Sequence, residues 1–255
     1  MATGKDAFRD VEAVHSTRLN PLLPCVMRLD GRSFSKMAKG LKRPFDEAFV
    51  NAMNQVAIAL AEGVDDCVLA YVQSDEVSLV LSSKPPQTPW FSWRVQKMTS
   101  VAASIASVAF YRAMVQAGPR YEAVMAARPP AFDARVMSLP ADLVADYLSW
   151  RQTDATRNAL AQAAYHVVGA KRTHGMRARQ MHEALFEMGV NFDDYPPRLK
   201  RGAVVFQQVY EKIGHDPTTN ADVRCTRRRW VLDEDAPVFE RDPSYLEERL
   251  AGLER

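Results

Sequence analysis

Residues 67–81 read CVLAYVQSDEVSLVL, two apolar runs joined by the polar turn Ser74-Asp75-Glu76. Short runs rich in Val, Leu and Tyr, with turn residues between them, are typical of paired β-strands. The stretch therefore predicts a β-hairpin with strands over 67–73 and 77–81 and an acidic pair at or beside its turn. The elements on either side of this hairpin decide which sheet it joins.

A second acidic turn stands nearer the start of the chain. The apolar run 24–29 predicts a strand, and it leads into the segment RLDGRSF at 28–34, so that Asp30 stands where a strand meets a turn. Asp46 is placed to cap a helix with apolar residues at helical spacing, and Gly63 is placed to end it. The expected elements of the first half are a strand over 24–29, the helix between Asp46 and Gly63, the hairpin, a helix over 91–117 and a strand over 131–139.

This β-α-β-β-α-β order predicts an α+β fold with a ferredoxin-like sheet, in which the first and third strands are antiparallel neighbours in the middle. The end of the first strand then lies beside the start of the third, which brings Asp30 and Asp75 to one edge. A single Asp-Gly turn is common on protein surfaces and carries little weight alone. Two carboxylates at one edge suit Mg²⁺, which bridges carboxylates to substrate phosphates. The pair therefore predicts a nucleotide-transfer site.

The composition is that of an ordinary globular protein. Of the 255 residues 47% are hydrophobic, and 33 Lys and Arg stand against 31 Asp and Glu, a formal charge of +2. This balance argues neither for nor against a nucleic-acid partner, so any basic surface must be local. The three distant cysteines argue against disulfides and zinc, and no apolar stretch is expected to reach the length of a membrane span. We expect a cytoplasmic protein without a membrane partner.

The chain divides into two expected domains. Residues 1–140 form a polymerase-like palm, and residues 141–255 form a mainly helical extension packed on it, with a β-hairpin whose strands are 203–210 and 230–232. Long helices are expected over 142–168 and 177–188. Basic residues gather in this second half: Lys171, Arg172, Arg177, Arg179, Arg198, Lys200, Arg201, Arg224, Arg227, Arg228 and Arg229.

A palm-like sheet with two metal ions positions a triphosphate and a nucleophilic oxygen, so cations must meet the phosphates. Lys42 and Arg43 stand just before the first helix, and Arg94 and Lys97 are three apart on one face of the second. Solvated helix faces carry such pairs too, and that alternative stays open. The chain has no Walker loop, Gly-x-Gly-x-x-Gly fingerprint or Gly-x-Ser-x-Gly elbow, so triphosphate binding has to use metal and side chains.

Four stretches together resemble the tRNA-His guanylyltransferase family, the polymerases that add nucleotides to tRNA 5′ ends in the 3′-to-5′ direction. They are residues 28–34, 43–46, 70–78 and 132–136. Weaker similarity continues through 146–152, 189–192, 201–204 and 227–229, so the resemblance spans about residues 20 to 235. One such motif would be weak evidence, whereas the ordered series is specific.

The resemblance implies a palm that binds two Mg²⁺ ions and uses GTP or ATP. It implies Asp30, Asp75 and the Gly31 carbonyl as metal ligands, with Glu76 as a further catalytic acid. The expected nucleotide-binding residues are Arg32, Ser33, Phe34, Arg43, Asp46, Ser74, Arg94 and Lys97. The expected tRNA-binding residues are Lys171, Arg172, Arg198, Lys200, Arg201, Arg227, Arg228 and Arg229, for which a solvated surface is the alternative. Family members assemble as tetramers, so a homotetramer is implied here too.

One segment departs from the histidine-specific members. Where they carry His-Ile-Asn-Asn-Leu-Tyr-Asn, this chain has TRNALAQ at 156–162 and retains only Asn158 and Leu160; Arg43 stands where Lys is usual. These changes favour the branch that resembles template-dependent repair of truncated tRNA 5′ ends. Addition of a single G to tRNA-His is the alternative.

Two further alternatives come from other classes. An RNA-recognition motif shares the β-α-β-β-α-β order, but it stacks bases on aromatic residues of its central strands, and 77–81 offers none. A nucleotide cyclase also has a palm-like domain with two carboxylates and metal. Its hairpin signature differs from Ser74-Asp75-Glu76, and it would lack the basic second half.

Overall fold

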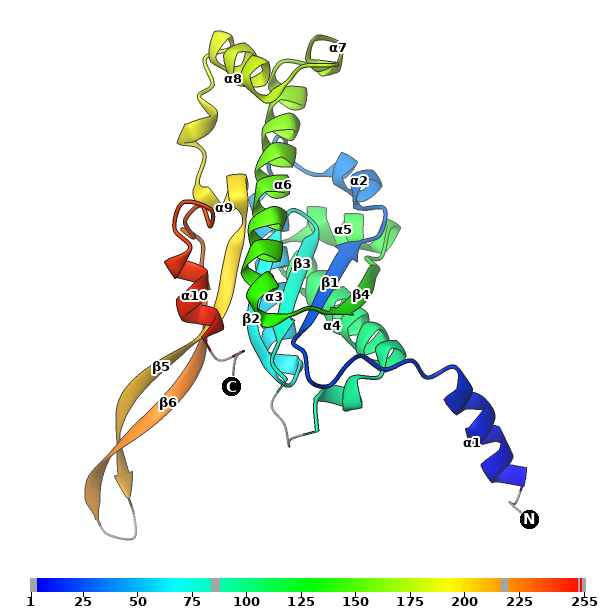
Figure 1. Ribbon diagram of the computed structural model, residues 1–255. Coiled ribbons are helices and arrows are strands. Elements are labelled where there is room, and N and C mark those ends of the chain that lie inside the picture. Colours follow the sequence, from blue (N-terminus) through cyan, green and yellow to red (C-terminus); the bar gives the residue numbers. More distant parts are fainter. Residues whose placement is uncertain (1–3, 84–87, 217–219, 252, 254–255) are drawn as a thin grey trace.

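A six-stranded antiparallel sheet organises the chain (Figure 1). The computed structural model describes residues 4–83, 88–216, 220–251 and 253. The strands are β1 (Cys25–Gly31), β2 (Cys67–Gln73), β3 (Glu76–Leu81), β4 (Phe132–Ser138), β5 (Ala203–Asp216) and β6 (Ala221–Asp233). Their order across the sheet is β4-β1-β3-β2-β5-β6, which confirms the expected central pairing of the first and third strands.

The helices cover both faces of the sheet. They are α1 (Gly4–Val14), α2 (Phe34–Met37), α3 (Glu47–Gly63), α4 (Val95–Gln116), α5 (Pro119–Ala127), α6 (Ala141–Val167), α7 (Ala170–Thr173), α8 (Ala178–Glu187), α9 (Pro197–Arg201) and α10 (Ser244–Leu250), with short 3-10 turns η1 (Ala38–Gly40), η2 (Trp90–Trp93) and η3 (Phe192–Asp194). Helices α3 and α4 pack on one face, while α6 and α10 pack on the other.

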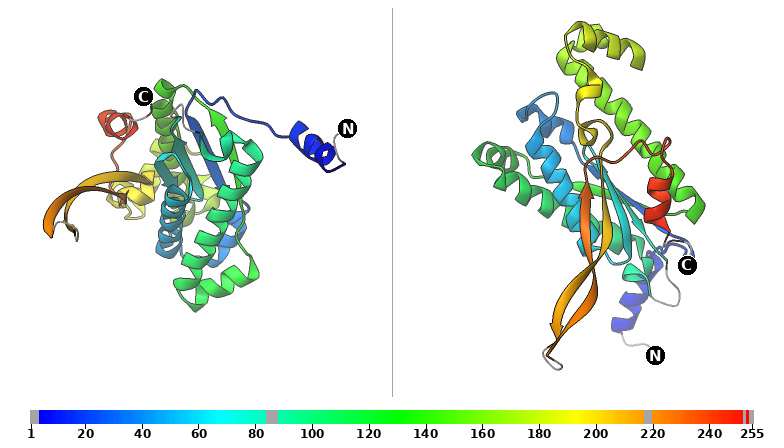
Figure 2. Two further views of the ribbon diagram at one scale, coloured as in Figure 1. Left: turned by 90° about the horizontal axis from the view of Figure 1, so that it is seen from below. Right: turned by 90° about the vertical axis from the view of Figure 1, so that its left-hand side faces the viewer.

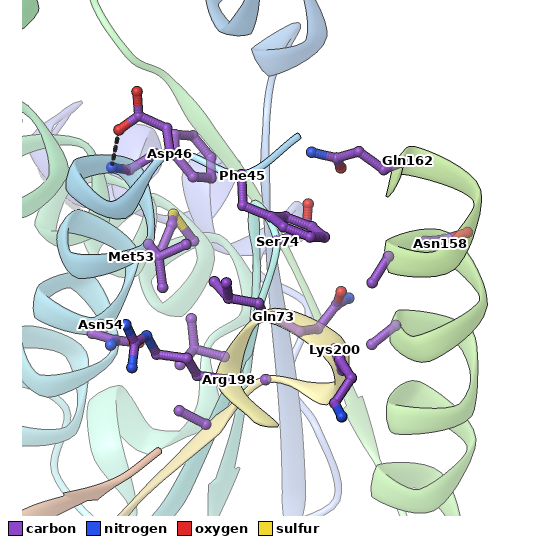
Figure 3. Close-up of a pocket in the computed structure, with 18 residues that line it drawn as sticks. Phe45, Asp46, Met53, Asn54, Gln73, Ser74, Asn158, Gln162, Arg198 and Lys200 are labelled. Carbon is purple, nitrogen blue, oxygen red and sulfur yellow. Dashed lines mark hydrogen bonds between the residues drawn. The ribbon is translucent and has the colours of Figure 1, made fainter. Parts of the chain in front are cut away.

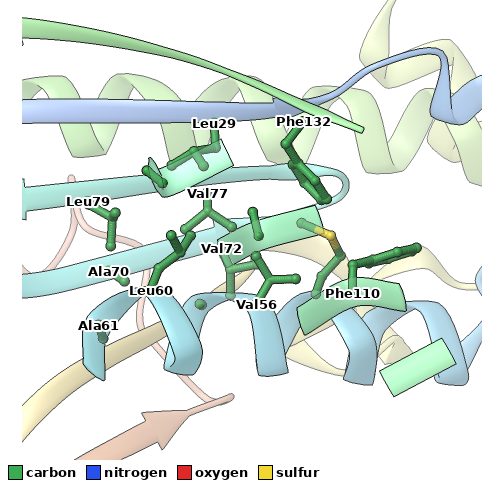
Figure 4. Close-up of a cluster of buried hydrophobic side chains, with 14 of the residues drawn as sticks. Leu29, Val56, Leu60, Ala61, Ala70, Val72, Val77, Leu79, Phe110 and Phe132 are labelled. Atoms are coloured by element: carbon green, nitrogen blue, oxygen red, sulfur yellow. The ribbon is translucent and has the colours of Figure 1, made fainter. Parts of the chain in front are cut away.

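Alternation along the strands produces the two cores. Met27 and Leu29 of β1 face α3 and α4 because their side chains point to the same side of the pleat, whereas Val26 points toward α6. Figure 4 shows the first core, where Leu29, Val77 and Leu79 of the sheet meet Val56 and Leu60 of α3. Helices thus cover both faces of the described central strands. These strands have no open face on which bases could stack, so the RNA-recognition-motif alternative is wrong.

Four aromatic rings close the first core next to Asp30. The ring of Phe34 lies 5.0 Å from those of both Phe110 and Phe132, and the Phe49 ring is 6.0 Å from Phe34. A Cβ at Gly31 would stand 2.5 Å from the Phe34 ring, so only glycine fits at that position. The end of β1, which carries Asp30 and Gly31, is therefore held by packing beneath it.

The second half of the chain completes the sheet begun by the first. β5 pairs with β2 through Tyr71, opposite Val204, and then continues with β6 far past the body of the molecule (Figure 2). The hairpin is longer than the expected strands 203–210 and 230–232, since β5 and β6 pair from Val204 to Asp216. The two expected domains share one continuous sheet, and the division at residue 140 stays a prediction.

Two expectations about the second helix are wrong. α4 begins at Val95 rather than Phe91, because Phe91, Ser92 and Trp93 have positive φ angles that interrupt the helix. By length and composition α4 is also able to cross a membrane, contrary to the expectation from the sequence. That criterion is weak, since buried core helices also meet it, and α4 packs on the sheet through Met98, Ala102, Ala106, Phe110 and Met114.

The aromatic cluster predicts a stability effect. Replacing the fully buried Phe110 by Ala removes contacts with three rings, so we expect the free energy of unfolding to fall by about 3–5 kcal/mol in urea titration. The matched control is Val108→Ala on the same helix, 58% exposed, which is expected to change it by less than about 0.5 kcal/mol. Equal effects of the two substitutions would contradict this packing.

Candidate functional site

The carboxylates of Asp30, at the end of β1, and Asp75, in the turn before β3, lie side by side at one end of the central strands. Asp30 pairs in register with Glu76 across β1 and β3, and the Gly31 N–H donates a 2.9 Å hydrogen bond to the Asp75 carbonyl. The pairing therefore fixes the Asp75 backbone against the end of β1. The convergence expected from topology is present in the fold.

The electrostatics of this edge are unfavourable without a cation. Burial raises the pKa of Asp75, and the negative charge of Asp30 raises it further. Burial likewise raises the pKa of Asp30, followed by repulsion from Glu76 and Asp133, against which Arg28 acts only in part. Two carboxylates that repel each other beside the Gly31 backbone carbonyl are hard oxygen donors suited to Mg²⁺.

The protein supplies few ligands of its own. Within the described part of the chain, no group of three or more His, Cys, Asp or Glu side chains is arranged to hold a metal. Mg²⁺ commonly uses one or two carboxylates and completes its shell with water and substrate phosphates. Asp30, Asp75 and the Gly31 carbonyl fit that kind of site and not a closed protein cage.

Glu76 has a different role from the one expected. It is 5% exposed, and both its carboxylate oxygens accept 2.7 Å hydrogen bonds from Arg151 of α6, with Arg28 at 3.8 Å. A buried carboxylate held in a bidentate pair is not free to bind metal or move a proton without leaving Arg151 unpaired. Glu76 instead ties the start of β3 to α6.

Two adjoining hollows open beside the carboxylate edge and share four residues, Asp46, Phe49, Ser74 and Gln162. The first, the inner hollow, lies between α3, α6 and α9 (Figure 3). Its walls include the apolar Phe45 and Met53, the amides of Gln73 and Asn158, and the cations Arg198 and Lys200. Such a mixture of flat apolar surface and amide groups suits a nucleobase.

The second, the cationic hollow, has a volume of about 320 Å³ and includes Asp75 in its wall. Lys42 and Arg43 line it from the loop before α3, and His166 lines it from the last turn of α6. No carboxylate lies within salt-bridge distance of these three side chains in the described structure. Two cations and a histidine without carboxylates in salt-bridge contact suit phosphate groups.

Asp46 and Phe34 are expected to bind the nucleotide, but their side chains also make contacts within the protein. The Asp46 carboxylate caps α3 as expected, accepting from the Ala48 and Phe49 N–H groups, and it also accepts from the Lys42 N–H and the Tyr121 hydroxyl. Its contribution is to fix the loop that carries Lys42 and Arg43. The Phe34 side chain is 3% exposed and packs in the aromatic core, and it lies at the wall of the cationic hollow. Both residues have structural roles, and since both also line the cationic hollow, their contact with a nucleotide stays a prediction.

Arg32, Ser33 and Ser74 stay at the carboxylate edge. Arg32 and Ser33 are exposed directly after β1 and line a separate hollow with Arg128. The Ser74 hydroxyl donates to the Asp75 carboxylate at 3.1 Å, and Ser74 has a positive φ of 48° in the turn. Ser74 therefore shapes the acidic turn as well as lining both hollows.

Arg94 and Lys97 lie away from the acids. Arg94 precedes α4 and pairs with Arg18, next to the chain that enters β1. Lys97 stands 13 residues before Phe110, which packs beside the Asp30-Gly31 turn, so the two are about 20 Å apart along the helix. Within one chain, Arg94 and Lys97 therefore lie at the opposite end of the strands from Asp30 and Asp75, whereas the sequence predicts them at the triphosphate.

The expected tRNA-binding residues fall into separate groups. Arg198 pairs with Glu47 at 2.8 Å, Lys200 donates to the Asp193 carbonyl, and Arg201 donates to the Ala236 carbonyl, so these three serve contacts within the fold. Lys171 and Arg172 lie on α7 near the far end of α6, and Arg172 pairs with Glu187. Arg227, Arg228 and Arg229 are exposed on β6, toward the opposite end of the molecule (Figure 1).

Comparison with known proteins decides the family. The family model described as tRNAHis guanylyltransferase matches residues 5–140, more than half of the chain. The chain belongs to the tRNA-His guanylyltransferase family, a family of nucleotidyltransferases. A probable tRNA(His) guanylyltransferase of Homo sapiens is 33% identical over 205 residues, which are 74% of this chain and 66% of that protein. The match thus spans just under two thirds of the length of that relative.

Solved structures of this tRNA-His guanylyltransferase family match almost the whole chain. A bacterial tRNA(His) guanylyltransferase-like protein in complex with ATP superposes with a TM-score of 0.83 at 28% identity, covering 97% of this chain and 99% of that chain. One in complex with GTP superposes with a TM-score of 0.74 at 28% identity, covering 96% and 98%. With the family shown, the cyclase alternative loses its basis.

Sequence reasoning about this tRNA-His guanylyltransferase-family chain missed three residues at the site. Arg151 enters the sequence analysis only as part of the weakly similar stretch 146–152. A charged residue between Leu148 and Ala155 on a buried helix face is nevertheless a signal of an internal ion pair. Tyr121 and His166 reach the site from α5 and the end of α6. No local pattern marks either of them, because their role comes from tertiary packing.

The raised pKa of Asp75 predicts how stability changes with pH. The Asp75 carboxyl holds a proton more tightly in the folded than in the unfolded protein. This group therefore lowers stability as the pH rises above the ordinary Asp pKa of 3.8. In metal-free buffer, Asp75→Asn is expected to raise the free energy of unfolding at pH 7, with no gain below about pH 4. Urea titrations across pH measure this, with exposed Asp65→Asn as control. A loss of stability at pH 7 would contradict the repulsion.

Proposed function

We propose that this protein is a Mg²⁺-dependent nucleotidyltransferase that adds nucleotides in the 3′-to-5′ direction to tRNA 5′ ends, in template-dependent repair. The observation that carries the proposal is the Asp30 and Asp75 pair at one sheet edge, opening onto a hollow lined by Lys42 and Arg43. That combination supplies metal-ligand oxygens and phosphate-binding cations within a sheet of palm-like order. The tRNA substrate follows from the family and belongs to the proposal.

The two hollows suggest how a nucleoside triphosphate is held. Bacterial relatives bind ATP and GTP, so this chain is proposed to bind both. In our account Lys42 and Arg43 hold the triphosphate in the cationic hollow, while the base enters the inner hollow beside Asn158 and Gln73. The shared wall at Ser74 and Gln162 makes one molecule spanning both hollows feasible.

The reaction is proposed to have two stages. The tRNA 5′-monophosphate first attacks the α-phosphate of a nucleoside triphosphate and releases pyrophosphate. The 3′-hydroxyl of an incoming nucleotide then attacks the activated 5′-phosphate and releases the nucleoside monophosphate. Asp30, Asp75 and the Gly31 carbonyl would hold two Mg²⁺ ions, which supply Lewis-acid neutralisation of charge on the reacting phosphates when bound. The chain itself orients the triphosphate through Lys42 and Arg43 and holds the acids in place through Glu76 and Arg151.

Template dependence is favoured by the departures at 156–162. This α6 segment faces the inner hollow through Asn158, Ala159 and Gln162, and it has lost most of the histidine-specific motif. The match over nearly the full chain to guanylyltransferase-like proteins of bacteria agrees with that branch. Addition of a single G to tRNA-His is the second candidate, supported by the names of the curated relatives.

The basic β6 ribbon is proposed to contact tRNA phosphates through Arg227, Arg228 and Arg229. These side chains are exposed, and among them Arg229 also stacks over Tyr210 and donates to Gln208. A two-stranded ribbon that extends past the body offers a surface for backbone contacts. A homotetramer and a cytoplasmic location complete the proposal, by resemblance to the family.

Nucleotide addition to 5′-truncated tRNAs tests the activity. The wild-type protein is expected to extend the 5′ end with the nucleotide complementary to the opposing base, while Asp30→Ala and Asp75→Ala reduce the rate by at least about 100-fold because the metal ligands are lost. Asp65→Ala is the control, since Asp65 is exposed in a turn outside both hollows.

Three outcomes of this assay would overturn parts of the account. Full activity of both Ala variants would remove the proposed site. Extension that ignores the opposing base would reject template dependence. Activity confined to one G on tRNA-His would favour the second candidate.

The ribbon makes a separate prediction. Arg228→Ala is expected to weaken binding to every tRNA to a similar degree and to lower the slope of log Kd against log salt by about 1, because one phosphate contact is lost. Filter binding over a salt series measures this, with the exposed Arg112→Ala of α4 as the matched control. An unchanged salt slope would show that Arg228 is a solvated surface residue.

A further inference from the structure

His166 stands out because the proposed chemistry gives it no task. It lies in the last turn of α6, half-buried, and lines the same cationic hollow as Asp75 and Arg43. Its ring packs edge-on against Tyr165 at 4.9 Å between centroids. A histidine held in the wall of a proposed phosphate site can change its charge near neutral pH, unlike the Lys and Arg beside it.

We propose that His166 is a phosphate-binding residue of the cationic hollow that takes up a proton when a triphosphate enters. This inference rests on the proposed nucleotide site and adds a residue and a proton to it. The last turn of a helix favours a cation, and three groups in the hollow can then share the phosphates: Lys42, Arg43 and the imidazolium of His166.

The charges around His166 explain why the proton comes with the ligand. Burial lowers its pKa, and the nearby Arg43 guanidinium lowers it further, so the ring is neutral in the free protein at neutral pH. Lys42 faces the hollow from the same loop as Arg43. The acids that face it are Asp75 of the β2–β3 turn, shared with the metal site, and Asp46, whose oxygens already accept backbone and Tyr121 hydrogen bonds. A triphosphate offsets the repulsion from Arg43 and gives the imidazolium a partner.

Titration calorimetry with inorganic tripolyphosphate and with GTP measures the proton directly. Binding enthalpies near pH 7 in two buffers of different ionisation enthalpy give the number of protons taken up. We expect a fraction of one proton for the wild-type protein, and a loss of affinity of up to about tenfold per pH unit as pH rises through the free-state pKa toward that of the complex.

Three variants separate charge from structure. His166→Asn is expected to lose the His-linked proton uptake and to bind about tenfold more weakly at pH 6. His166→Lys is expected to restore tight binding and to remove that part of the pH dependence, because its charge is permanent. His174→Asn, exposed after α7 and outside the hollow, is expected to match the wild-type protein.

The outcomes distinguish this inference from the proposed function. If the wild-type protein binds neither tripolyphosphate nor GTP, the nucleotide site itself is wrong and the inference falls with it. If it binds both and takes up no more protons than His166→Asn, the site stands and the role of His166 is refuted. If His166→Asn folds poorly, His166→Lys supplies the comparison, since equal proton uptake by His166→Lys and the wild-type protein refutes the proposal.

Discussion

The antiparallel pairing of β1 with β3 is the constraint on which the site depends. Its register sets Asp30 opposite Glu76 and joins the Gly31 N–H to the Asp75 carbonyl. Because side chains alternate along a strand, a shift of one residue would turn Asp30 into the aromatic core and Leu29 toward α6. The large apolar faces of both strands therefore fix the position of a polar site that has little stability of its own.

The carboxylates at this end of the sheet repel one another, and contacts elsewhere in the fold offset that repulsion. Asp30, Asp75 and Glu76 are close in space, and burial makes their charge more costly. Arg151 reaches from α6 to take both oxygens of Glu76, and removing one partner of such a buried pair typically costs about 3–5 kcal/mol. α6 thus connects the acids to the two hollows, since the same helix carries Asn158, Gln162 and His166.

Local patterns in the sequence were enough for the order of the elements and for the two acids. Apolar runs with turn residues predicted β2 over its full length, and the βαββαβ order then placed Asp30 beside Asp75. The patterns failed where tertiary contacts decide. Arg94 and Lys97 looked like a pair on one helix face, yet positive φ angles before α4 and the direction of that helix carry them to the other edge. Glu76 pairs with Arg151 of α6, and Asp46 accepts a hydrogen bond from Tyr121 of α5. No spacing in the sequence predicts such contacts.

The most direct test of the central claim is the position of the metal. Crystals grown with GTP and Mn²⁺ in place of Mg²⁺ give anomalous diffraction that locates the ion without assumption about its ligands. If the two acids are the metal ligands, peaks lie between the Asp30 and Asp75 carboxylates and the Gly31 carbonyl, with the triphosphate extending toward Lys42 and Arg43. Peaks elsewhere on the chain, with Asp30 and Asp75 free of metal while GTP is bound, would contradict it.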